Sequence, residues 1–334
     1  MEYFKLHLYM PQNSTSILAP SFLPATVVFE MTYRCNHSCL FCSCPWENEN
    51  DSFKKQKELS VEEWKNVISV LCKMGIMNFA FSGGEPLMKE GIIEIIEYAA
   101  SCKSEHIETV NNTLVSEFKT PKLFLLSNGL LMNAEIIALC KKHDIHLSMS
   151  LPGFDTFEQH TLRKNREQVL HWFTEAKKAG LSTTVNVTVT RKNLHELYET
   201  ISMALLAGAD SLLMNRFLPG GRGIKYAKEL MLEKKDVVEM LDIAEEVLQT
   251  ANRKGSVGTE LPKCIIPEDR NYKQLSIGTR CSAAIEFFVV GPSGYIRTCN
   301  HSPIEMNHYT EIEKIKDHPY WKKFIIERVQ TNNV

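Results

Sequence analysis

The chain has 334 residues, more than one domain usually holds, so a large unit with a smaller one is expected. Hydrophobic residues make up 44% and charged residues 23%, which excludes a disordered or fibrous chain. The net charge is -2, from 38 Lys and Arg against 40 Asp and Glu, so a nucleic-acid partner is not expected.

The start of the chain and its cysteine content predict a cytoplasmic protein. No run approaches 18 consecutive apolar residues, so no membrane span is expected. The first residues also lack the basic region and apolar core of a signal peptide. Ten cysteines in a reducing compartment favour metal or redox chemistry over disulfides.

Strand-like apolar runs alternate with amphipathic segments from residue 25 onward. The first helix is expected to begin at Ser60, which forms a capping box with Glu63. Two more helices are expected at 166–179 and at 233–252. The alternation predicts a parallel β/α sheet, open or partly closed into a barrel. The expected strands are Ala25–Met31, Met77–Phe81, Leu123–Leu126, Ile145–Ser150, Thr183–Thr190 and Ser211–Asn215.

Changes of pattern along the chain suggest three parts. Residues 1–24 are an N-terminal extension, 25–225 form the barrel-like part, and 226–334 form a linker helix with a small C-terminal domain. Within the second part, residues 103–121 are polar without a clear period and are expected to be an insertion.

Three cysteines follow the first expected strand. Cys35, Cys39 and Cys42 have a spacing that lets three thiolates hold one side of a small metal cluster. A four-iron cluster usually takes four ligands, so one iron would stay open for a chelating small molecule. Phe41 could give that molecule an apolar face. The alternative is a zinc site with Cys44 or His37 as the fourth ligand.

A glycine-rich turn follows the second expected strand. Gly83 and Gly84 let the backbone come close to a ligand, and Glu85 can bind an ammonium group. In parallel β/α sheets, ligands gather at the carboxyl ends of the strands. The two motifs are therefore expected to serve one site.

Together these residues resemble the radical S-adenosylmethionine (SAM) superfamily. Cys35, Cys39, Phe41 and Cys42 match its C-x-x-x-C-x-Φ-C motif, and Gly83 to Pro86 match its G-G-E-P motif. The resemblance covers about residues 25–220 and implies a partial (β/α)6 barrel. It also implies a [4Fe-4S] cluster with SAM, an electron donor such as flavodoxin or ferredoxin, and reductive cleavage of SAM to a 5′-deoxyadenosyl radical.

Further positions are carried over from the resemblance. Pro152 stands where the family pattern has an aspartate, so that carboxylate is absent. Ser150 and Arg163 would hold the methionine carboxylate of SAM, Asn186 would touch the ribose, and a backbone group at Leu218 would contact the adenine. The cofactor-binding residues implied are thus Phe41, Gly83, Gly84, Glu85, Ser127, Asn128, Ser150, Arg163, Asn186 and Leu218.

A second group of cysteines lies near the C-terminus. Twelve residues separate Cys281 from Gly294 and four separate Gly294 from Cys299, which resembles the opening of the SPASM extension. No cysteine follows Cys299, so a second auxiliary cluster is not expected. The resemblance implies one auxiliary cluster, held by Cys281, Cys299 and Cys264, as in the shorter twitch form. The alternative is a truncated chain that has lost these ligands.

Several functions follow from the resemblance. The leading one is a maturase that abstracts hydrogen from a ribosomally made peptide and leaves a cross-link or an epimerised residue. The alternatives are a sulfatase-maturing type of protein oxidase and a tetrapyrrole-modifying enzyme. Outside enzymes, the alternative is a metal-stabilised protein that binds peptide.

Overall fold

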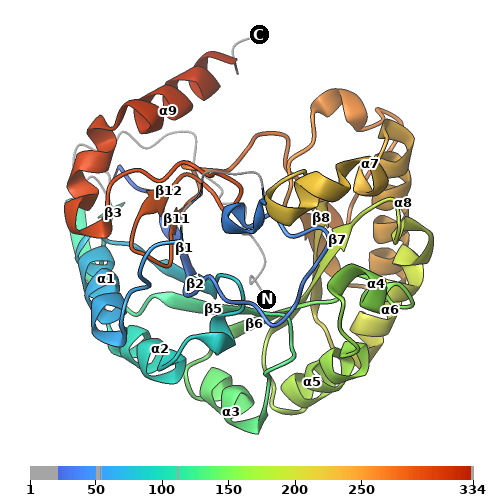
Figure 1. Ribbon diagram of the computed structural model, residues 1–334, viewed down its shortest axis with the longest axis horizontal. Coiled ribbons are helices and arrows are strands. Elements are labelled where there is room, and N and C mark those ends of the chain that lie inside the picture. The colour runs from blue at the N-terminus through green and yellow to red at the C-terminus, as the bar shows by residue number, and fades with distance from the viewer. Residues whose placement is uncertain (1–21, 50–52, 54, 111–112, 332–334) are drawn as a thin grey trace. The chain divides into compact units, whose positions relative to one another are not determined.

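The computed structural model describes residues 22–49, 53, 55–110 and 113–331. Most of the predicted N-terminal extension therefore lies outside the described residues. The chain divides into two compact units (Figure 1). Unit 1 comprises residues 1–33, 55–124 and 282–334, and unit 2 comprises residues 34–54 and 125–281.

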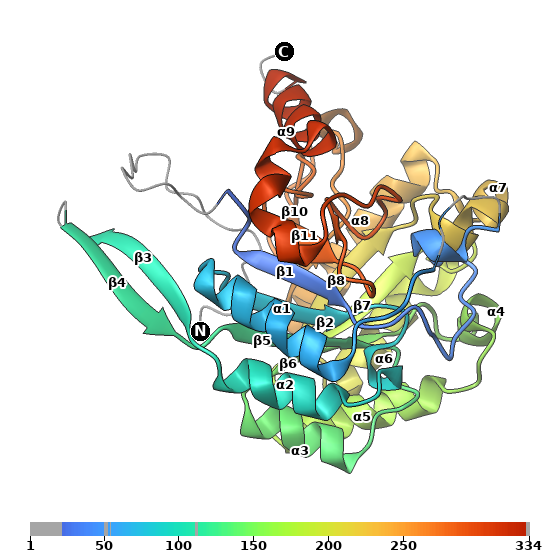
Figure 2. The same cartoon turned by 60° about the vertical axis from the view of Figure 1, so that its left-hand side comes forward.

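Unit 1 is built on a mixed sheet whose strands come from distant parts of the chain. β1 pairs in parallel with β2 on one side and with β11 on the other, and β11 pairs antiparallel with β12. A separate antiparallel pair, β3 and β4, extends away from α1 and α2 (Figure 2). The elements are β1 (Thr26–Glu30), α1 (Val61–Lys73), β2 (Asn78–Ser82), α2 (Ile92–Ser101), β3 (Ser104–Val110), β4 (Thr113–Lys119), β11 (Phe287–Val290), β12 (Ile296–Arg297) and α9 (Pro319–Thr331).

Aromatic rings fill the core of unit 1. The Phe29 ring lies 5.3–5.6 Å, centroid to centroid, from the rings of Phe79, Phe81 and Trp64. These four side chains are fully buried. Trp64 belongs to the buried face of α1, and the predicted capping box of Ser60 and Glu63 is present. The predicted first helix is therefore confirmed.

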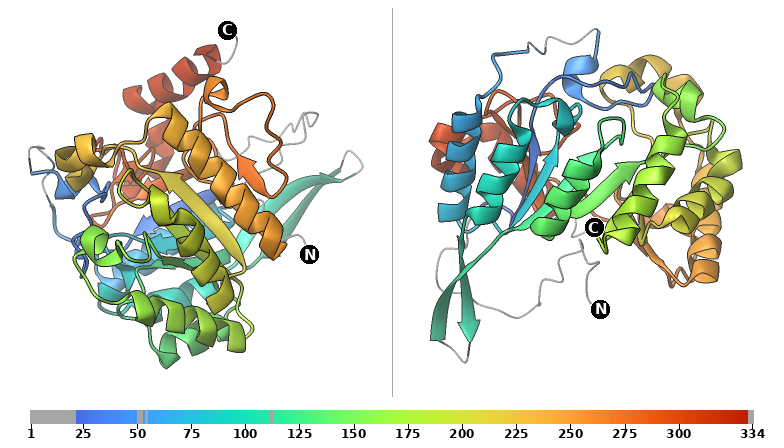
Figure 3. Two further views of the ribbon diagram at one scale, coloured as in Figure 1. Left: turned by 90° about the vertical axis from the view of Figure 1, so that its right-hand side faces the viewer. Right: turned by 90° about the horizontal axis from the view of Figure 1, so that it is seen from below.

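Unit 2 repeats a strand and a helix along a parallel sheet. β6, β7, β8, β9 and β10 pair in sequence order, and the last three residues of β5 also belong to this unit. α6 packs against α5 and α8 (Figure 3). The elements are β5 (Lys122–Ser127), α3 (Ala134–Lys142), β6 (His146–Ser150), α4 (Phe157–Thr161), α5 (Arg166–Lys178), β7 (Thr183–Val189), α6 (Leu197–Ala207), β8 (Ser211–Arg216), α7 (Ala227–Leu230), α8 (Lys234–Ala251), β9 (Lys254–Val257) and β10 (Leu275–Ile277).

The six expected strands correspond to β1, β2, β5, β6, β7 and β8 within one residue at each end. The predicted α/β class with a mostly parallel sheet is confirmed. The polar insertion at 103–121 is a hairpin, which the absence of a clear period did not reveal. Among the described residues, no helix combines the length and the hydropathy needed to span a membrane.

Candidate functional site

The cysteine loop, residues 35–42, lies in unit 2. Backbone hydrogen bonds to α4 hold one side of this loop. The N–H of Ser38 donates to the carbonyl of Thr161 at 3.1 Å, and that of Leu40 donates to His160 at 2.9 Å. The His160 ring is fully buried and lies 6.0 Å from the Phe41 ring. The predicted apolar face at Phe41 is thus packed beside α4.

The glycine-rich segment after β8 holds the other side of this loop. The N–H of Gly223 donates to the carbonyl of Cys42 at 3.0 Å. A guanidinium nitrogen of Arg222 donates to the carbonyl of Cys39 at 3.2 Å, and the same side chain pairs with Glu47. The cation therefore sits beside the thiols that the motif singles out.

The thiols of the motif influence one another. Burial raises the pKa of Cys39, and negative charge on Cys42 and on Cys35 raises it further. A hydrogen bond from the Cys44 thiol lowers the pKa of Cys42 and makes it the thiol of that pair that ionises first. Three thiols that repel one another as anions suit a shared cationic centre.

The thiols of Cys35, Cys39 and Cys42 are ligands that fit an iron–sulfur cluster. The sequence motif identifies these ligands, because the three side chains are not arranged around a common centre. In the described part of the chain, no group of three or more His, Cys, Asp or Glu side chains is already arranged as a metal-ion site. The Sγ of Cys35 accepts weak hydrogen bonds from the N–H of His37 at 3.5 Å and from the Asn128 amide at 3.8 Å. Donors of this kind stabilise a thiolate ligand.

Asn36, between the first two cysteines, connects two of the predicted cofactor residues to the loop. Its side-chain oxygen accepts from Nδ2 of Asn128 at 2.6 Å. Its backbone carbonyl accepts from Nε of Arg163. Asn128 follows β5 and Arg163 follows α4, so the structure brings both beside the cysteine loop, as their assignment to one site requires.

Ser127, Ser150 and Leu218 lie at or just after strand ends, whereas Asn186 lies in the middle of β7. Ser127 is buried and its hydroxyl accepts from the N–H of Gly129 at 3.1 Å, a contact that shapes the turn. Ser150 ends β6, and the next residue bonds to the carbonyl of Asn186 at 2.9 Å. The Asn186 amide oxygen accepts from Asn215 at 3.1 Å. Leu218 follows β8 and is half-buried.

The G-G-E-P turn lies in unit 1. Gly83 has φ +133°, and a Cβ there would lie 2.9 Å from the backbone nitrogen of Met31. The N–H of Gly84 donates to the carbonyl of Thr32 at 3.0 Å. Glu85 is buried and accepts from the N–H of Leu87 at 3.3 Å. The glycines therefore let this turn lie against the chain after β1, and their approach to a ligand stays a prediction.

The C-terminal cysteines lie in different units. Cys264 and Cys281 are exposed in unit 2, and Cys299 is half-buried in unit 1. Cys299 follows β12 in a turn closed by the N–H of Ser302, which donates to its carbonyl at 3.2 Å. The antiparallel pair of β11 and β12 precedes this turn in the chain.

Buried charges hold the Cys299 turn. Arg297 pairs with Glu30 of β1, and both side chains are at most 2% exposed. Arg297 also donates to the carbonyl of Ser302 at 2.9 Å, and the Asn300 amide donates to Glu30 at 2.9 Å. The sequence did not reveal this pair, nor the role of Arg222, because the partners are far apart in the chain. Arg222 carried one signal, its place in a glycine-rich segment after a strand.

Known proteins resemble this chain in sequence and in fold. The chain is 25% identical over 286 residues to a PqqA peptide cyclase of Bradyrhizobium diazoefficiens, covering 83% of this chain and 67% of the relative. Among solved structures, SuiB of Streptococcus suis bound to SAM gives a TM-score of 0.66 at 13% identity, covering 90% of this chain and 68% of SuiB. Native anSMEcpe with bound AdoMet gives 0.64 at 15% identity, covering 90% and 82%.

The family model adds the decisive match. The model described as the radical SAM superfamily matches residues 29–204, more than half of the chain and a stretch that contains both motifs. The chain therefore belongs to the radical SAM superfamily.

Proposed function

We propose that this chain is a radical SAM enzyme that acts on a peptide. The observation that carries the proposal is the cysteine loop, whose three motif thiols are held between α4 and the Gly221–Tyr226 segment with Arg163 and Asn128 beside them. In this family, a reduced [4Fe-4S] cluster held by the motif cysteines would supply one electron to the sulfonium of SAM, whose carbon–sulfur bond would break to give methionine and a 5′-deoxyadenosyl radical.

The residues of this chain have separate tasks in the proposal. Cys35, Cys39 and Cys42 hold the cluster, and Arg222 offsets the negative charge of its thiolate ligands. Arg163 and Ser150 hold the carboxylate of SAM, and Asn186 and Leu218 contact its nucleoside. Gly83, Gly84 and Glu85 receive its amino group. Radical chemistry needs such positioning because a misplaced radical reacts with the nearest hydrogen donor.

The names of similar proteins support a peptide substrate. PqqA peptide cyclases are similar to this chain over most of its length. SuiB has been solved with its precursor peptide SuiA, and anSMEcpe with AdoMet and a peptide. We therefore propose hydrogen abstraction from a ribosomally made peptide, with a cross-link or an epimerised residue as product, in the cytoplasm and with flavodoxin or ferredoxin as electron donor.

The test is 5′-deoxyadenosine formation from SAM and dithionite after anaerobic reconstitution. The wild-type chain should produce it, and the triple variant Cys35→Ala, Cys39→Ala, Cys42→Ala should not. Cys140→Ala is the matched control, since Cys140 is buried on α3 away from the motif. Deoxyadenosine production by the triple variant would overturn the assignment.

We further propose one auxiliary cluster at Cys264, Cys281 and Cys299. The reconstituted chain should then hold about eight irons, and the variant Cys281→Ala, Cys299→Ala about four. About four irons in both the wild-type chain and this variant would contradict the auxiliary cluster but would be consistent with the cluster at Cys35, Cys39 and Cys42.

A further inference from the structure

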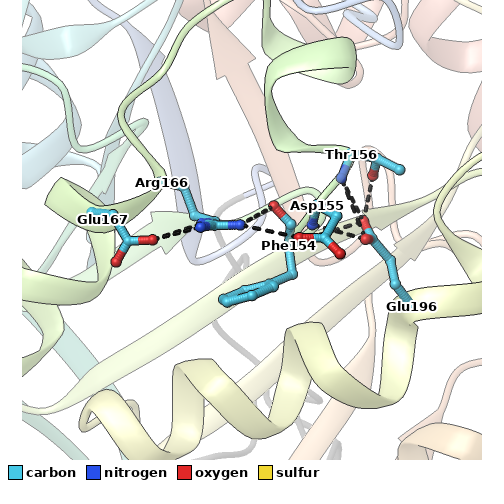
Figure 4. A network of polar contacts seen from close by, with 6 residues as sticks. All are labelled: Phe154, Asp155, Thr156, Arg166, Glu167 and Glu196. Carbon is cyan, nitrogen blue, oxygen red and sulfur yellow. Dashed lines mark hydrogen bonds and ion pairs between the residues drawn. The ribbon is translucent and has the colours of Figure 1, made fainter.

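The buried carboxylate of Glu196 accepts hydrogen bonds from the loop between β6 and α4. Glu196 ends the short helix Leu194–Glu196 and is 6% exposed. Its two oxygens accept hydrogen bonds from the backbone N–H groups of Phe154 at 3.0 Å, Asp155 at 2.8 Å and Thr156 at 3.2 Å (Figure 4). The Thr156 hydroxyl donates to the same carboxylate.

The segment that carries Glu196 holds this part of the fold at two further points. The Asn193 amide donates to the carbonyl of Pro152 at 2.7 Å. The Thr190 hydroxyl and Nε2 of His160 are 2.9 Å apart, so the same segment also reaches the last turn of α4. Residues 190–196 thus contact both the loop and the helix that follows it.

Arg166 fixes the loop from the start of α5. Its guanidinium lies 4.0 Å from the centre of the Phe154 ring and donates to the Phe154 carbonyl at 2.9 Å. It also pairs with Asp155 and with Glu167 (Figure 4). The loop is therefore held by a carboxylate at its N–H groups and by a cation at a carbonyl.

The contacts of Glu196 differ from an ordinary helix cap. Thr156 precedes α4, yet its side chain makes no capping bond to the helix and donates to Glu196 instead. An acceptor for four donors is supplied from an element 40 residues further along the chain. A buried charge satisfied in this way has one geometry, because three of its donors are fixed in the backbone.

The end of α4 carries this geometry to the cysteine loop. His160 and Thr161 form the last turn of α4 and accept the N–H groups of Leu40 and Ser38. These two residues flank Cys39 in the sequence. A shift of α4 would therefore move the backbone on both sides of Cys39, whose carbonyl is held from the other side by Arg222 of the segment that also holds Cys42.

We propose that Glu196 is a positioning residue for the cysteine loop. Glu196 fixes the position of α4, and α4 fixes the position of Cys39. The inference rests on the proposed function for its chemical meaning. The contacts from Glu196 through α4 to the residues beside Cys39 are present in the protein without a cluster, so they are tested in the metal-free chain.

The experiment compares Glu196→Gln with Glu199→Gln. Glu199 lies three residues later on α6 and is exposed, so its substitution removes the same charge without touching the loop. Hydrogen exchange is followed by mass spectrometry in the chain without metal. In Glu196→Gln, an NH2 group replaces one of the two carboxylate oxygens. This NH2 group faces backbone N–H groups and cannot accept hydrogen bonds from them. Exchange over residues 36–42 should therefore rise about tenfold in that variant and stay at the wild-type rate in the control.

A second measurement reads the loaded protein. After reconstitution, iron should be lost to a chelator several times faster from Glu196→Gln than from Glu199→Gln, and Glu196→Asp should recover part of the difference. Wild-type exchange over 36–42 in Glu196→Gln would overturn the proposal, even if its Tm were lower. Thr156→Val, which removes the hydroxyl that donates to Glu196, gives the same test if Glu196→Gln does not fold.

The outcomes separate this inference from the proposed function. Faster exchange in Glu196→Gln supports the positioning role whether or not the wild-type chain forms deoxyadenosine. Deoxyadenosine formation with unchanged exchange supports the enzyme and removes the role of Glu196.

Discussion

Gly221 shows how one residue decides whether the cysteine loop can form. It has φ +46°, and a Cβ at this position would lie 2.3 Å from the carbonyl oxygen of Cys44 and 2.7 Å from that of Cys42. Both neighbours are backbone atoms and cannot swing aside. The residue must therefore be glycine for two reasons, the left-handed backbone and the close approach.

We expect Gly221→Ala to destabilise the chain by more than the usual cost of a left-handed alanine, about 1–2 kcal/mol. Gly180→Ala is the matched control, because Gly180 has φ +71° but only the Lys141 Nζ, a flexible chain end, within 4 Å. Urea unfolding gives both values. Equal losses for the two variants would show that the backbone of the cysteine loop moves aside at no cost.

His146 predicts a pH effect on stability. Burial lowers the pKa of His146 to about 4, from 6.5, and both ring nitrogens contact hydroxyls, of Ser182 at 3.0 Å and Thr184 at 2.7 Å. The unfolded chain takes up a proton below pH 6.5 that the folded chain refuses until about pH 4. Stability should therefore fall across this window, by about 3 kcal/mol from this group.

The difference between wild type and His146→Gln isolates that effect. Thermal unfolding at about pH 7 and about pH 5 should show a smaller loss of Tm on acidification in His146→Gln, while His171→Gln, exposed on α5, should follow the wild type. Identical slopes in all three proteins would contradict the burial of a neutral imidazole.

Residues whose partners are close in the sequence were predictable, and residues whose partners are distant were not. Ser60 and Glu63 form a capping box because they are three positions apart, a spacing that the first turn of a helix brings together. Arg222 and Glu196 act on segments far away in the sequence, and those contacts depend on how the strands align. The thiols of the motif were identified by their spacing, whereas the cation beside them was not.

At the scale of elements, contacts between residues close in the sequence define the start of α1. The Ser60 hydroxyl accepts from the N–H of Glu63 at 3.3 Å, and the Glu63 carboxylate accepts from the N–H of Ser60 at 2.7 Å. We expect Ser60→Ala to lower the free energy of unfolding by about 1 kcal/mol. Ser101→Ala, at the exposed end of α2, should change it by less than half as much, as measured in urea.

The β3–β4 hairpin shows why another element escaped prediction. Alternation of apolar and polar residues marks a strand only when one face is buried. On β4, Phe118 is 65% exposed and Val115 39%. The hairpin is anchored instead at its start, where the buried Ser104 hydroxyl donates to the carbonyls of Cys72 and Ile76. An anchor of this kind leaves no periodic pattern in the sequence.

At the scale of the molecule, the Glu30–Arg297 pair joins the first strand of unit 1 to the last. Burial lowers the pKa of Arg297 to about 10, so the side chain is still charged at neutral pH. We expect Arg297→Met to destabilise the chain by about 3–5 kcal/mol, because it strands a buried carboxylate. Glu30→Gln with Arg297→Met should recover most of that loss in urea unfolding, and a double variant as unstable as Arg297→Met would contradict it.

The pairing of β1 with β11 has a consequence for how the protein is made. About 260 residues separate these strands in the chain. At usual rates of translation, β1 leaves the ribosome on the order of ten to fifty seconds before its partner exists. During that time an apolar strand edge is exposed, and such edges recruit other chains. The edge of β1 that pairs with β11 is therefore the part of the nascent unit 1 sheet that we expect to associate with other chains before synthesis is complete.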